Sequence, residues 1–560
     1  ELYKRKPDVL CFSCYIWNID YVTDIAREYK KLCPSVPIWV GGPEVSYEVE
    51  AFLRENPYID GVMIGEGEDT FRELCGYYAH KRKLSDIAGI AFRKNSTGNS
   101  TSNRTSVNNA GCKADEIVFT SPRPIKNMSE IPFCYDTLDD FSNRIIYYES
   151  SRGCPFSCSY CLSSVDKTLR FRDTRIVKRE LKFFIDQKVP QIKFVDRTFN
   201  CNHAHAMELW RFIKANDNGV TNFHFEISAD LLNQEELELI SDMRPGLIQL
   251  EIGVQSTNEV TIKEIHRTMK LERLKEVVRL IQSGNNIHEH LDLIAGLPYE
   301  DYDSFGRSFD EIYELKPNQL QLGFLKVLKG SYMFEHAAEY GIVYHDKPPY
   351  EVMSTKWLSF DDVIKIKRVE DMLEVYYNSG QFEITMKLME CIFDSAFEFF
   401  QELGDFYEAN GYFGMSHSRI RRCEILLEFL ALYLHGCDND AMTSVVLSEN
   451  DGDRDNTDFD ENAQIYKMIQ ESLIFDLYYR ENCKSRPVWA TDIGSFKHMT
   501  HAYCKNGKLS HVEPFHYIFP DKHTRKLDEL PKYHKEPVWA LFHYDMRDPL
   551  DHQALVEYVE

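Results

Sequence analysis

Short apolar strands alternate with amphipathic helices six times in succession between Asn143 and about Lys326. Helices are expected over residues 173–187, 204–216, 271–283 and 302–315. The expected strands cover residues 143–150, 191–197, 222–229, 247–255, 287–295 and 319–326. A strand–helix unit that repeats in this way predicts an α/β protein with a parallel sheet, either a partial barrel or a doubly wound sheet.

These strands carry different side chains on their two faces. In 247–255, Leu250, Ile252 and Val254 share one face, whereas the other face holds polar residues and a glycine, namely Gln249, Glu251, Gly253 and Gln255. The same split recurs in 223–230, in 288–295 and in 319–324. A closed eight-stranded barrel fills its interior with apolar side chains, so a polar face predicts a wet, ligand-filled lumen here. The alternative, a sheet with one solvated face, is more typical of antiparallel strands.

Histidines lie on this predicted lumen face. His288 and His290 alternate with apolar residues and share the face with Asp292. One of them could act as a general base or orient a substrate, because histidine titrates near neutral pH. The alternative is a structural histidine that hydrogen bonds within the lumen. No catalytic residue is assigned from the sequence.

Composition restricts the partners of the chain. The 560 residues allow several domains, and 65 basic against 89 acidic residues give a formal net charge of −24, which disfavours nucleic acid. No apolar run approaches the roughly 20 residues of a membrane helix. Fifteen cysteines without a disulfide-framework spacing indicate a reducing compartment, so we expect a cytoplasmic protein.

Composition shifts suggest four regions. Residues 1–94 alternate strands and helices as a Rossmann-like parallel unit, and 95–140 are a linker or insertion that begins with a Ser/Asn/Thr-rich segment. The barrel is expected over 141–335 and a mostly helical C-terminal cap over 336–560, with helices at 360–377, 384–402, 418–434 and 463–479 and a mixed aromatic-rich tail from about 486. Because the chain starts at Glu1 and almost at once enters a strand, we expect the first domain to be incomplete.

A cysteine motif directly follows the first barrel strand. Cys154, Cys158 and Cys161 have the spacing C-x3-C-x2-C. Thiolates at this spacing can close on one metal centre, of zinc, copper(I) or iron and sulfur. A zinc site needs a fourth ligand nearby, and the next candidates, Cys201 and His203, lie about 40 residues further on. The spacing favours a 4Fe-4S cluster with one open iron; a zinc site and free thiols are the alternatives.

With Tyr160 before its last cysteine, this motif resembles the signature of the radical S-adenosylmethionine (SAM) enzymes. The resemblance implies a partial (β/α)6 barrel, a 4Fe-4S cluster on Cys154, Cys158 and Cys161, and SAM chelated to the open iron. It also implies cleavage of SAM to a 5′-deoxyadenosyl radical with an electron from an external donor of the flavodoxin or ferredoxin type.

Other cofactor-binding positions follow only from this resemblance. Phe156 and Tyr160 match residues on the adenine side, and Asp196 matches a position near the methionine amino group. The polar faces of two further strands match ribose- or carboxylate-binding positions, namely Glu226, Ser228, Glu251 and Gln255. For each of these residues, an ordinary polar role in the lumen is the alternative.

Two glycine turns in the first domain each follow a strand and precede a helix, where backbone amides can receive a polar ligand. They are Gly41-Gly42-Pro43-Glu44 and Gly65-Glu66-Gly67-Glu68, and Ser13 is expected at the same edge. Upstream of a radical domain, these turns resemble the cobalamin-binding domain of cobalamin-dependent radical SAM enzymes. The Asp-x-His-x-x-Gly motif is absent, which implies a histidine-off corrinoid. Residues 324–331 and those after them resemble a subgroup with an uncharacterised C-terminal domain.

The combined resemblance implies methylation of an unactivated carbon of a small or natural-product-like molecule, with cobalamin as the second cofactor. A cobalamin-dependent cyclisation or rearrangement is one alternative. A cobalamin or cluster sensor without turnover is another, from a different class of protein. RNA modification is disfavoured by the acidic charge and by the lack of a basic tract.

Overall fold

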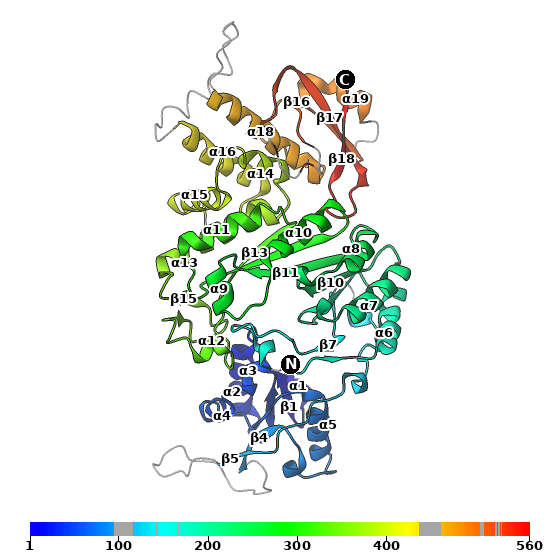
Figure 1. Ribbon diagram of the computed structural model, residues 1–560, viewed down its shortest axis with the longest axis vertical. Coiled ribbons are helices and arrows are strands. Elements are labelled where there is room, and N and C mark those ends of the chain that lie inside the picture. Colours follow the sequence, from blue (N-terminus) through cyan, green and yellow to red (C-terminus); the bar gives the residue numbers. More distant parts are fainter. Residues whose placement is uncertain are drawn as a thin grey trace.

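The computed structural model describes residues 1–94, 116–141, 144–165, 167–435, 461–504, 509–520, 524, 527 and 529–559. Residues 95–115 of the predicted linker or insertion therefore lie outside the described residues. Figure 1 shows the N-terminal sheet at one end of the long axis, the six-stranded sheet in the middle and the C-terminal region at the other end. Within the described part of the chain, no helix combines the length and the apolar character that a membrane crossing requires.

The N-terminal domain contains a five-stranded sheet in the order β1-β2-β3-β4-β5. Its strands are β1 (Leu10–Ser13), β2 (Ile38–Gly41), β3 (Gly61–Met63), β4 (Ile90–Arg93) and β5 (Ile117–Phe119), and its helices are α1 (Leu2–Arg5), α2 (Ile19–Leu32), α3 (Pro43–Ser46), α4 (Val49–Glu55) and α5 (Gly67–Tyr78). β1, β2 and β3 are parallel, whereas β4 runs antiparallel to β3. The expectation of a wholly parallel unit was therefore wrong for the fourth strand. The segment between α5 and β4, which includes the 3-10 helix Leu84–Asp86, brings the chain back to the carboxyl end of β3, where the Ile64 N–H donates to Gly89 O.

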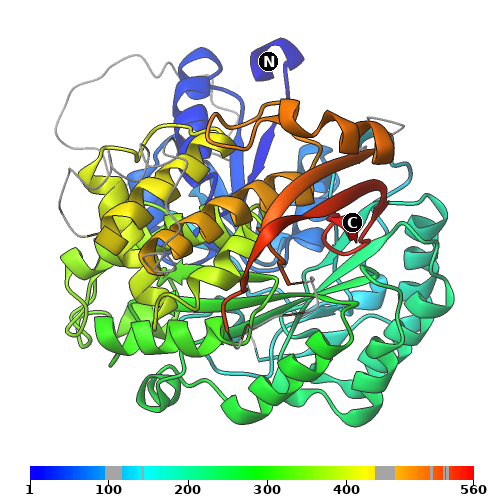
Figure 2. The same ribbon diagram turned by 90° about the horizontal axis from the view of Figure 1, so that it is seen from above.

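The central sheet has six parallel strands in chain order, as predicted. They are β6 (Ile146–Tyr148), β9 (Gln191–Phe194), β10 (Asn222–Ile227), β11 (Ile248–Gln255), β12 (His288–Ala295) and β13 (Gln319–Phe324). The sheet is open, since β6 and β13 form its two edges. The helices that connect the strands are α6 (Thr174–Asp186), α7 (His203–Ala215), α8 (Gln234–Ser241), α9 (Glu259–Glu264), α10 (Leu271–Ser283) and α11 (Tyr302–Tyr313). In Figure 2 the green helices lie along the outer side of this sheet.

Local sequence explains where these helices begin. At the first turn of five of these helices, the side chain of an asparagine or aspartate accepts a backbone N–H. These capping residues are Asp173 for α6, Asn202 for α7, Asn233 for α8, Asn258 for α9 and Asp301 for α11. Exposure alternates along β11: its apolar face is buried and its polar face is half-buried. The connecting helices therefore cover one face, and the polar face lies toward the inside of the curved sheet.

The C-terminal region is helical with a small sheet. Its helices are α12 (Tyr332–Glu335), α13 (Phe360–Leu373), α14 (Glu383–Met389), α15 (Ala396–Ala409), α16 (Arg419–His435), α18 (Glu461–Arg480) and α19 (Lys497–Tyr503). Its strands are the short pair β14 (Val343–Tyr344) and β15 (Val352–Ser354), and β16 (Ser510–Tyr517), β17 (Tyr533–Arg547) and β18 (Ala554–Val559), which form an antiparallel sheet. The hydrophobic core of the six-stranded sheet continues into this region, whereas the N-terminal domain has separate cores.

The single helix predicted over 384–402 is two helices. Ser395 caps α15 by accepting the backbone N–H of Glu398, and its hydroxyl donates to Asp310 Oδ2 at 2.7 Å. Asp310 Oδ1 also accepts the backbone N–H of Phe397 at 2.8 Å. Because Asp310 of α11 fixes this cap, a new helix begins after Ser395, although the apolar pattern had predicted one continuous helix.

Candidate functional site

A cavity of about 190 Å³ lies between the cysteine loop and the polar face of β10, β11 and β12. The loop follows β6 and the two-residue strand β7 (Ser151–Arg152). The cavity is lined by Cys154, Phe156, Cys158, Tyr160, Cys161, Arg197, Thr198, Glu226, Ile227, Ser228, Glu251, Gly253, Gln255, Arg267, Thr268 and Asp292. The structure therefore brings together the three cysteines and every other barrel residue singled out as cofactor-binding, except Asp196.

Backbone contacts fix the shape of the cysteine loop. Gly153 has a φ of +90°, and a Cβ at this position would lie 2.5 Å from the carbonyl oxygen of Thr168, so only glycine fits before Cys154. At the middle of the loop, the Ser159 N–H donates to Ile265 O and the Met333 N–H donates to Ser159 O, both at 2.9 Å. The loop thus packs between the segment after α9 and the start of α12.

The cysteine arrangement fits a cluster better than a single ion. Among the described residues, no group of three or more His, Cys, Asp or Glu side chains is placed to hold one metal ion. In an iron–sulfur cubane each cysteine binds a different iron, so the three thiolates need not meet at one point. Three cysteines that line one cavity, with no further Cys or His in its wall, match the donor set of a cluster with an open iron.

Asp196 lies beneath the loop and not in the cavity wall. Its fully buried carboxylate accepts hydrogen bonds from Ser150 N (2.9 Å), Ser150 Oγ (2.6 Å) and Ser151 Oγ (2.5 Å). Burial raises the pKa of Asp196 to about 6, against these hydrogen bonds, which lower it. In this structure Asp196 positions the strand that leads into the cysteine loop; its contact with a cofactor stays a prediction.

Charged residues on the polar face differ in their protonation. Burial raises the pKa of Glu226 to about 6, although the nearby Arg197 lowers it. Burial, followed by the charges of Glu251 and Glu226, raises the pKa of Asp292 well above its ordinary value. Burial also opposes ionisation of Glu251, but His224 Nε2 at 2.9 Å and Lys193 Nζ at 2.8 Å outweigh it and lower the Glu251 pKa to about 2. The cavity therefore combines a fixed negative charge at Glu251 with two carboxyls that hold protons more readily.

Arg267 is a residue of the cavity that the sequence did not reveal. Its Nη1 lies 3.2 Å from the Tyr160 hydroxyl and 3.8 Å from Cys158 Sγ, and its Nη2 donates to the carbonyl of Gly253. This places a guanidinium beside one of the thiols. No local pattern signals the contact, because Arg267 and Cys158 are 109 positions apart in the chain. Thr268 was missed for the same reason, whereas Arg197 and Thr198 directly follow Asp196 at the end of β9, and their position in the sequence was a local signal for them.

The first glycine turn of the N-terminal domain closes tightly on β1. Gly42 has a φ of +111°, and a Cβ there would lie 2.5 Å from Cys14 O. Pro43 then begins α3, and the carboxylate of Glu44 accepts a hydrogen bond from the Tyr350 hydroxyl of the C-terminal region. Burial raises the Glu44 pKa, although this hydrogen bond lowers it. Ser13 ends β1 at the same edge of the sheet.

The second glycine turn is open on one side and paired on the other. A Cβ on Gly65 or on Gly67 would meet nothing within 4 Å, and Gly65 and Glu66 line a cavity of about 340 Å³ at the end of β3. The carboxylate of Glu66 lies 2.7 Å from Arg170 Nη1. The Glu68 carboxylate lies 2.8 Å from Arg152 Nη2, next to the cysteine loop. The open glycines and the cavity are a cradle that a large ligand could fill.

Comparisons with known protein families match three parts of the chain. Residues 1–75 match the B12 binding domain family, and residues 148–312 match the radical SAM superfamily. Residues 338–553 match a family described as a protein of unknown function, DUF4080. The order of these matches agrees with the order of the two cavities along the chain.

Curated relatives match about half of the chain. The chain is 28% identical over 333 residues to "Cobalamin-dependent radical SAM methyltransferase TokK" of Streptomyces tokunonensis, which covers 55% of this chain and 45% of that protein. It is 25% identical over 263 residues to an anaerobic magnesium-protoporphyrin IX monomethyl ester cyclase of Synechocystis sp., covering 45% of this chain and 48% of the relative. The chain thus spans about half the length of these relatives.

A solved structure shares the architecture. The cobalamin-dependent SAM radical enzyme OxsB, with aqua-cobalamin and SAM bound, superposes with a TM-score of 0.51 at 14% identity over 85% of this chain and 73% of that chain. At this identity the likeness shows the fold alone.

Together, the fold, the cysteine cavity and the three family matches define the class as a radical SAM protein with a cobalamin-binding domain. The chain belongs to the cobalamin-dependent radical SAM family, with a C-terminal region of the DUF4080 type. Its cofactors are a 4Fe-4S cluster, SAM and cobalamin.

Proposed function

We propose that this protein is a methyltransferase that acts on an unactivated carbon of a small molecule. The observation that carries the proposal is the cavity at the carboxyl ends of the parallel strands, which is lined by the three cysteines and by Glu226, Ser228 and Gln255. When bound, the cluster and SAM supply a 5′-deoxyadenosyl radical, and cobalamin supplies a carrier of methyl groups. Methyltransferases among the relatives support this choice.

The residues of the chain bind and orient the cofactors in this proposal. Cys154, Cys158 and Cys161 hold the cluster, and Arg267 stabilises the thiolate of Cys158. Glu226, Ser228 and Gln255 offer hydrogen-bond acceptors and donors to SAM from the polar face, and Phe156 and Tyr160 cover its adenine. The cradle at Gly65 and Gly67 receives cobalamin. The ion pairs of Arg152 with the second glycine turn fix the position of this cradle relative to the cysteine loop.

A cyclisation or rearrangement is the second candidate. It uses the same cofactors and the same cavity, and it is supported by the matches to anaerobic magnesium-protoporphyrin IX monomethyl ester cyclases. A sensor without turnover is the third candidate function, because it would bind the same cofactors as the two enzymes. An external one-electron donor of the flavodoxin or ferredoxin type is part of both enzymatic proposals.

The test is an anaerobic turnover assay. Protein with a reconstituted cluster is mixed with methylcobalamin, SAM and a strong reductant, and the nucleoside products are quantified by mass spectrometry. Cys158→Ala removes one cluster ligand, and Cys134→Ala, an exposed cysteine outside the motif, is its matched control. Formation of 5′-deoxyadenosine with S-adenosylhomocysteine, lost only in Cys158→Ala, is the expected result.

Other products would change the conclusion. 5′-Deoxyadenosine alone favours the cyclisation or rearrangement. If protein with a full cluster forms neither nucleoside, both enzymatic proposals fail and the sensor remains.

A further inference from the structure

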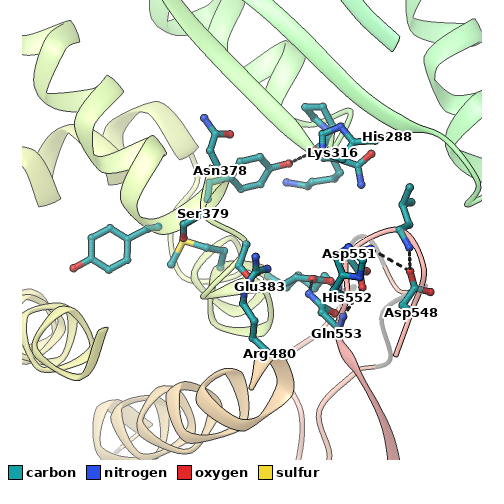
Figure 3. A pocket seen from close by; sticks show the side chains of 18 of the residues that line it. His288, Lys316, Asn378, Ser379, Glu383, Arg480, Asp548, Asp551, His552 and Gln553 are labelled. Atoms are coloured by element: carbon teal, nitrogen blue, oxygen red, sulfur yellow. Dashed lines mark hydrogen bonds and ion pairs between the residues drawn. The ribbon is translucent and has the colours of Figure 1, made fainter. Parts of the chain in front are cut away.

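A second cavity, of about 340 Å³, lies at the opposite end of the six-stranded sheet. Its wall includes His288 at the start of β12 and Lys316 just before β13, together with residues of α14, α18 and the turn between β17 and β18. Figure 3 shows Glu383 and Arg480 on one side of this space, Asp551, His552 and Gln553 on another, and His288 and Lys316 above them. His288 and Asp292 are four residues apart on β12, so this cavity is about 13 Å along the strand from the cluster cavity.

Most charges in this cavity are already compensated, but one cation is not. Lys316 pairs with Glu390 at 2.7 Å, and Lys387 pairs with Glu383 at 2.9 Å. Arg480 forms no ion pair with any residue that the structure describes. Its guanidinium makes only a 3.3 Å contact from Nη1 to the carbonyl of Gly380. A half-buried guanidinium without a carboxylate partner is suited to a carboxylate of a ligand.

Two buried polar atoms on the wall also lack partners. Gln553 is only 2% exposed; its amide nitrogen donates to Glu383, but within the described part of the protein its Oε1 accepts no hydrogen bond. His288 Nδ1 likewise has no partner among the described residues. Burial, followed by the neighbouring His290 and His224, lowers the His288 pKa to about 4, so the ring is neutral at pH 7 and can accept a hydrogen bond. Unpartnered polar atoms in a buried wall are costly unless a ligand satisfies them.

The carboxylates of the wall exclude a multiply charged anion. Glu383, Glu390, Asp548 and Asp551 all line the cavity, so a phosphate dianion at Arg480 would face like charges. A ligand with one carboxylate and one ammonium group carries no net charge and avoids this repulsion. Apolar surface is available as well, from Pro317, Met386 and Leu550.

We propose that this cavity binds a free α-amino acid with a medium-sized apolar side chain. The carboxylate lies on Arg480, the ammonium group donates to Gln553 Oε1 and His288 Nδ1, and the side chain lies against Met386 and Leu550. The site is separate from the cluster cavity and stands whether or not the protein is a methyltransferase.

The experiment uses the full chain, and it begins with thermal-shift measurements against each of the common L-amino acids. The strongest stabiliser, for which L-leucine or L-methionine is expected, is then titrated by calorimetry. Its decarboxylated amine and its deaminated acid serve as matched probes. We expect one site per chain, and each truncated probe should bind at least about tenfold more weakly, because each loses one charge-assisted contact.

Variants separate this site from the cluster. Arg480→Gln and His288→Phe should each weaken binding about tenfold, whereas Arg175→Gln, an exposed arginine on α6, should leave it unchanged. Cys158→Ala, which cannot hold a complete cluster, should bind the amino acid as the parent protein does. The proposal is overturned if no amino acid binds, if Arg480→Gln binds as tightly as the parent, or if binding disappears in Cys158→Ala, which would place the amino acid on the open iron.

Discussion

Arg152 Nη2 lies 2.8 Å from the carboxylate of Glu68, and this contact ties the cysteine loop to the second glycine turn of the N-terminal domain. Nη1 of the same guanidinium lies 3.2 Å from Glu66. Arg152 precedes the first cluster cysteine by two residues, so the ion pairs fix the loop of one cofactor relative to the cradle of the other. Chemistry that uses both cofactors needs this kind of fixed relationship.

The coupling between Arg152 and Glu68 can be measured by a double-mutant cycle. Arg152→Gln and Glu68→Gln are each expected to destabilise the protein, and together by less than their sum, with a coupling of about 0.5–1 kcal/mol at low salt. Both side chains are partly exposed, so the coupling should shrink at high salt. Hydrogen exchange of residues 65–70 and 150–158 should rise in each variant. The exposed pair of Arg54 and Glu50 on α4 is the control, and changing it should alter exchange in neither segment.

Alanine substitutions in the two glycine turns are expected to have different effects on stability and on cobalamin binding. Gly42→Ala forces a Cβ to 2.5 Å from Cys14 O at a φ of +111°, and is expected to cost about 1–3 kcal/mol of stability and with it cobalamin binding. Gly67→Ala places a methyl group in open space at the start of α5, so stability should be kept while cobalamin affinity falls several-fold.

Thermal unfolding and absorbance titration with cobalamin distinguish these outcomes. Gly76→Ala is the control, since Gly76 lies inside α5 and its Cβ would be in ordinary contact with Arg82 at 3.5 Å. It should be neutral or slightly stabilising, with unchanged cobalamin affinity. Unchanged affinity in Gly67→Ala would show that cobalamin does not occupy this cradle.

Features with a local cause could be predicted from the sequence. The repeated strand–helix pattern and the alternation along β11 are read within a few residues, and they gave the six parallel strands and their polar face. The direction of β4 could not be read, because an apolar run such as Ile90–Arg93 looks the same in either orientation. The sheet of β16, β17 and β18 was missed within a tail that offered only aromatic residues as a signal.

The site divides in the same way. The cysteines and the polar strand residues are local patterns, and the fold brings them to one cavity. Arg267 reaches this cavity from a loop after α9, and Glu66 and Glu68 meet arginines of another domain. Such partners depend on how distant segments pack, which no spacing within the motif can indicate.

Arg267 is expected to set the reduction potential of the cluster. Its guanidinium lies 3.8 Å from Cys158 Sγ, and a positive charge near the cluster favours the reduced state. Arg267→Gln should lower the potential by about 60 mV, the equivalent of a tenfold change in a one-electron equilibrium. Arg267→Lys keeps a charge and should retain most of the potential. The measurement is a redox titration followed by electron paramagnetic resonance, normalised to cluster content, and equal potentials in all three proteins would contradict the assignment.

Removal of the Glu226 charge is expected to stabilise the protein in a pH-dependent way. Its pKa in the folded protein is raised to about 6, first by burial. A carboxyl group whose pKa is raised on folding favours the folded state at low pH, and this contribution is lost as the pH rises through about 6. Above that pH the ionised carboxylate costs about 2 kcal/mol. Glu226→Gln should therefore raise the unfolding temperature at pH 8 and change it little at pH values near 4.5.

The same substitution separates stability from cofactor binding. If Glu226 accepts hydrogen bonds from SAM, Glu226→Gln should be more stable at pH 8 and yet bind SAM about tenfold more weakly, because a charge-assisted hydrogen bond is replaced by a neutral one. Glu238→Gln, on the exposed side of α8, is the control and should change neither property. A variant that gains stability equally at both pH values would mean that the gain does not come from the Glu226 charge. Unchanged SAM affinity would show that Glu226 does not bind SAM and is a residue of the lumen wall whose burial lowers the stability of the protein.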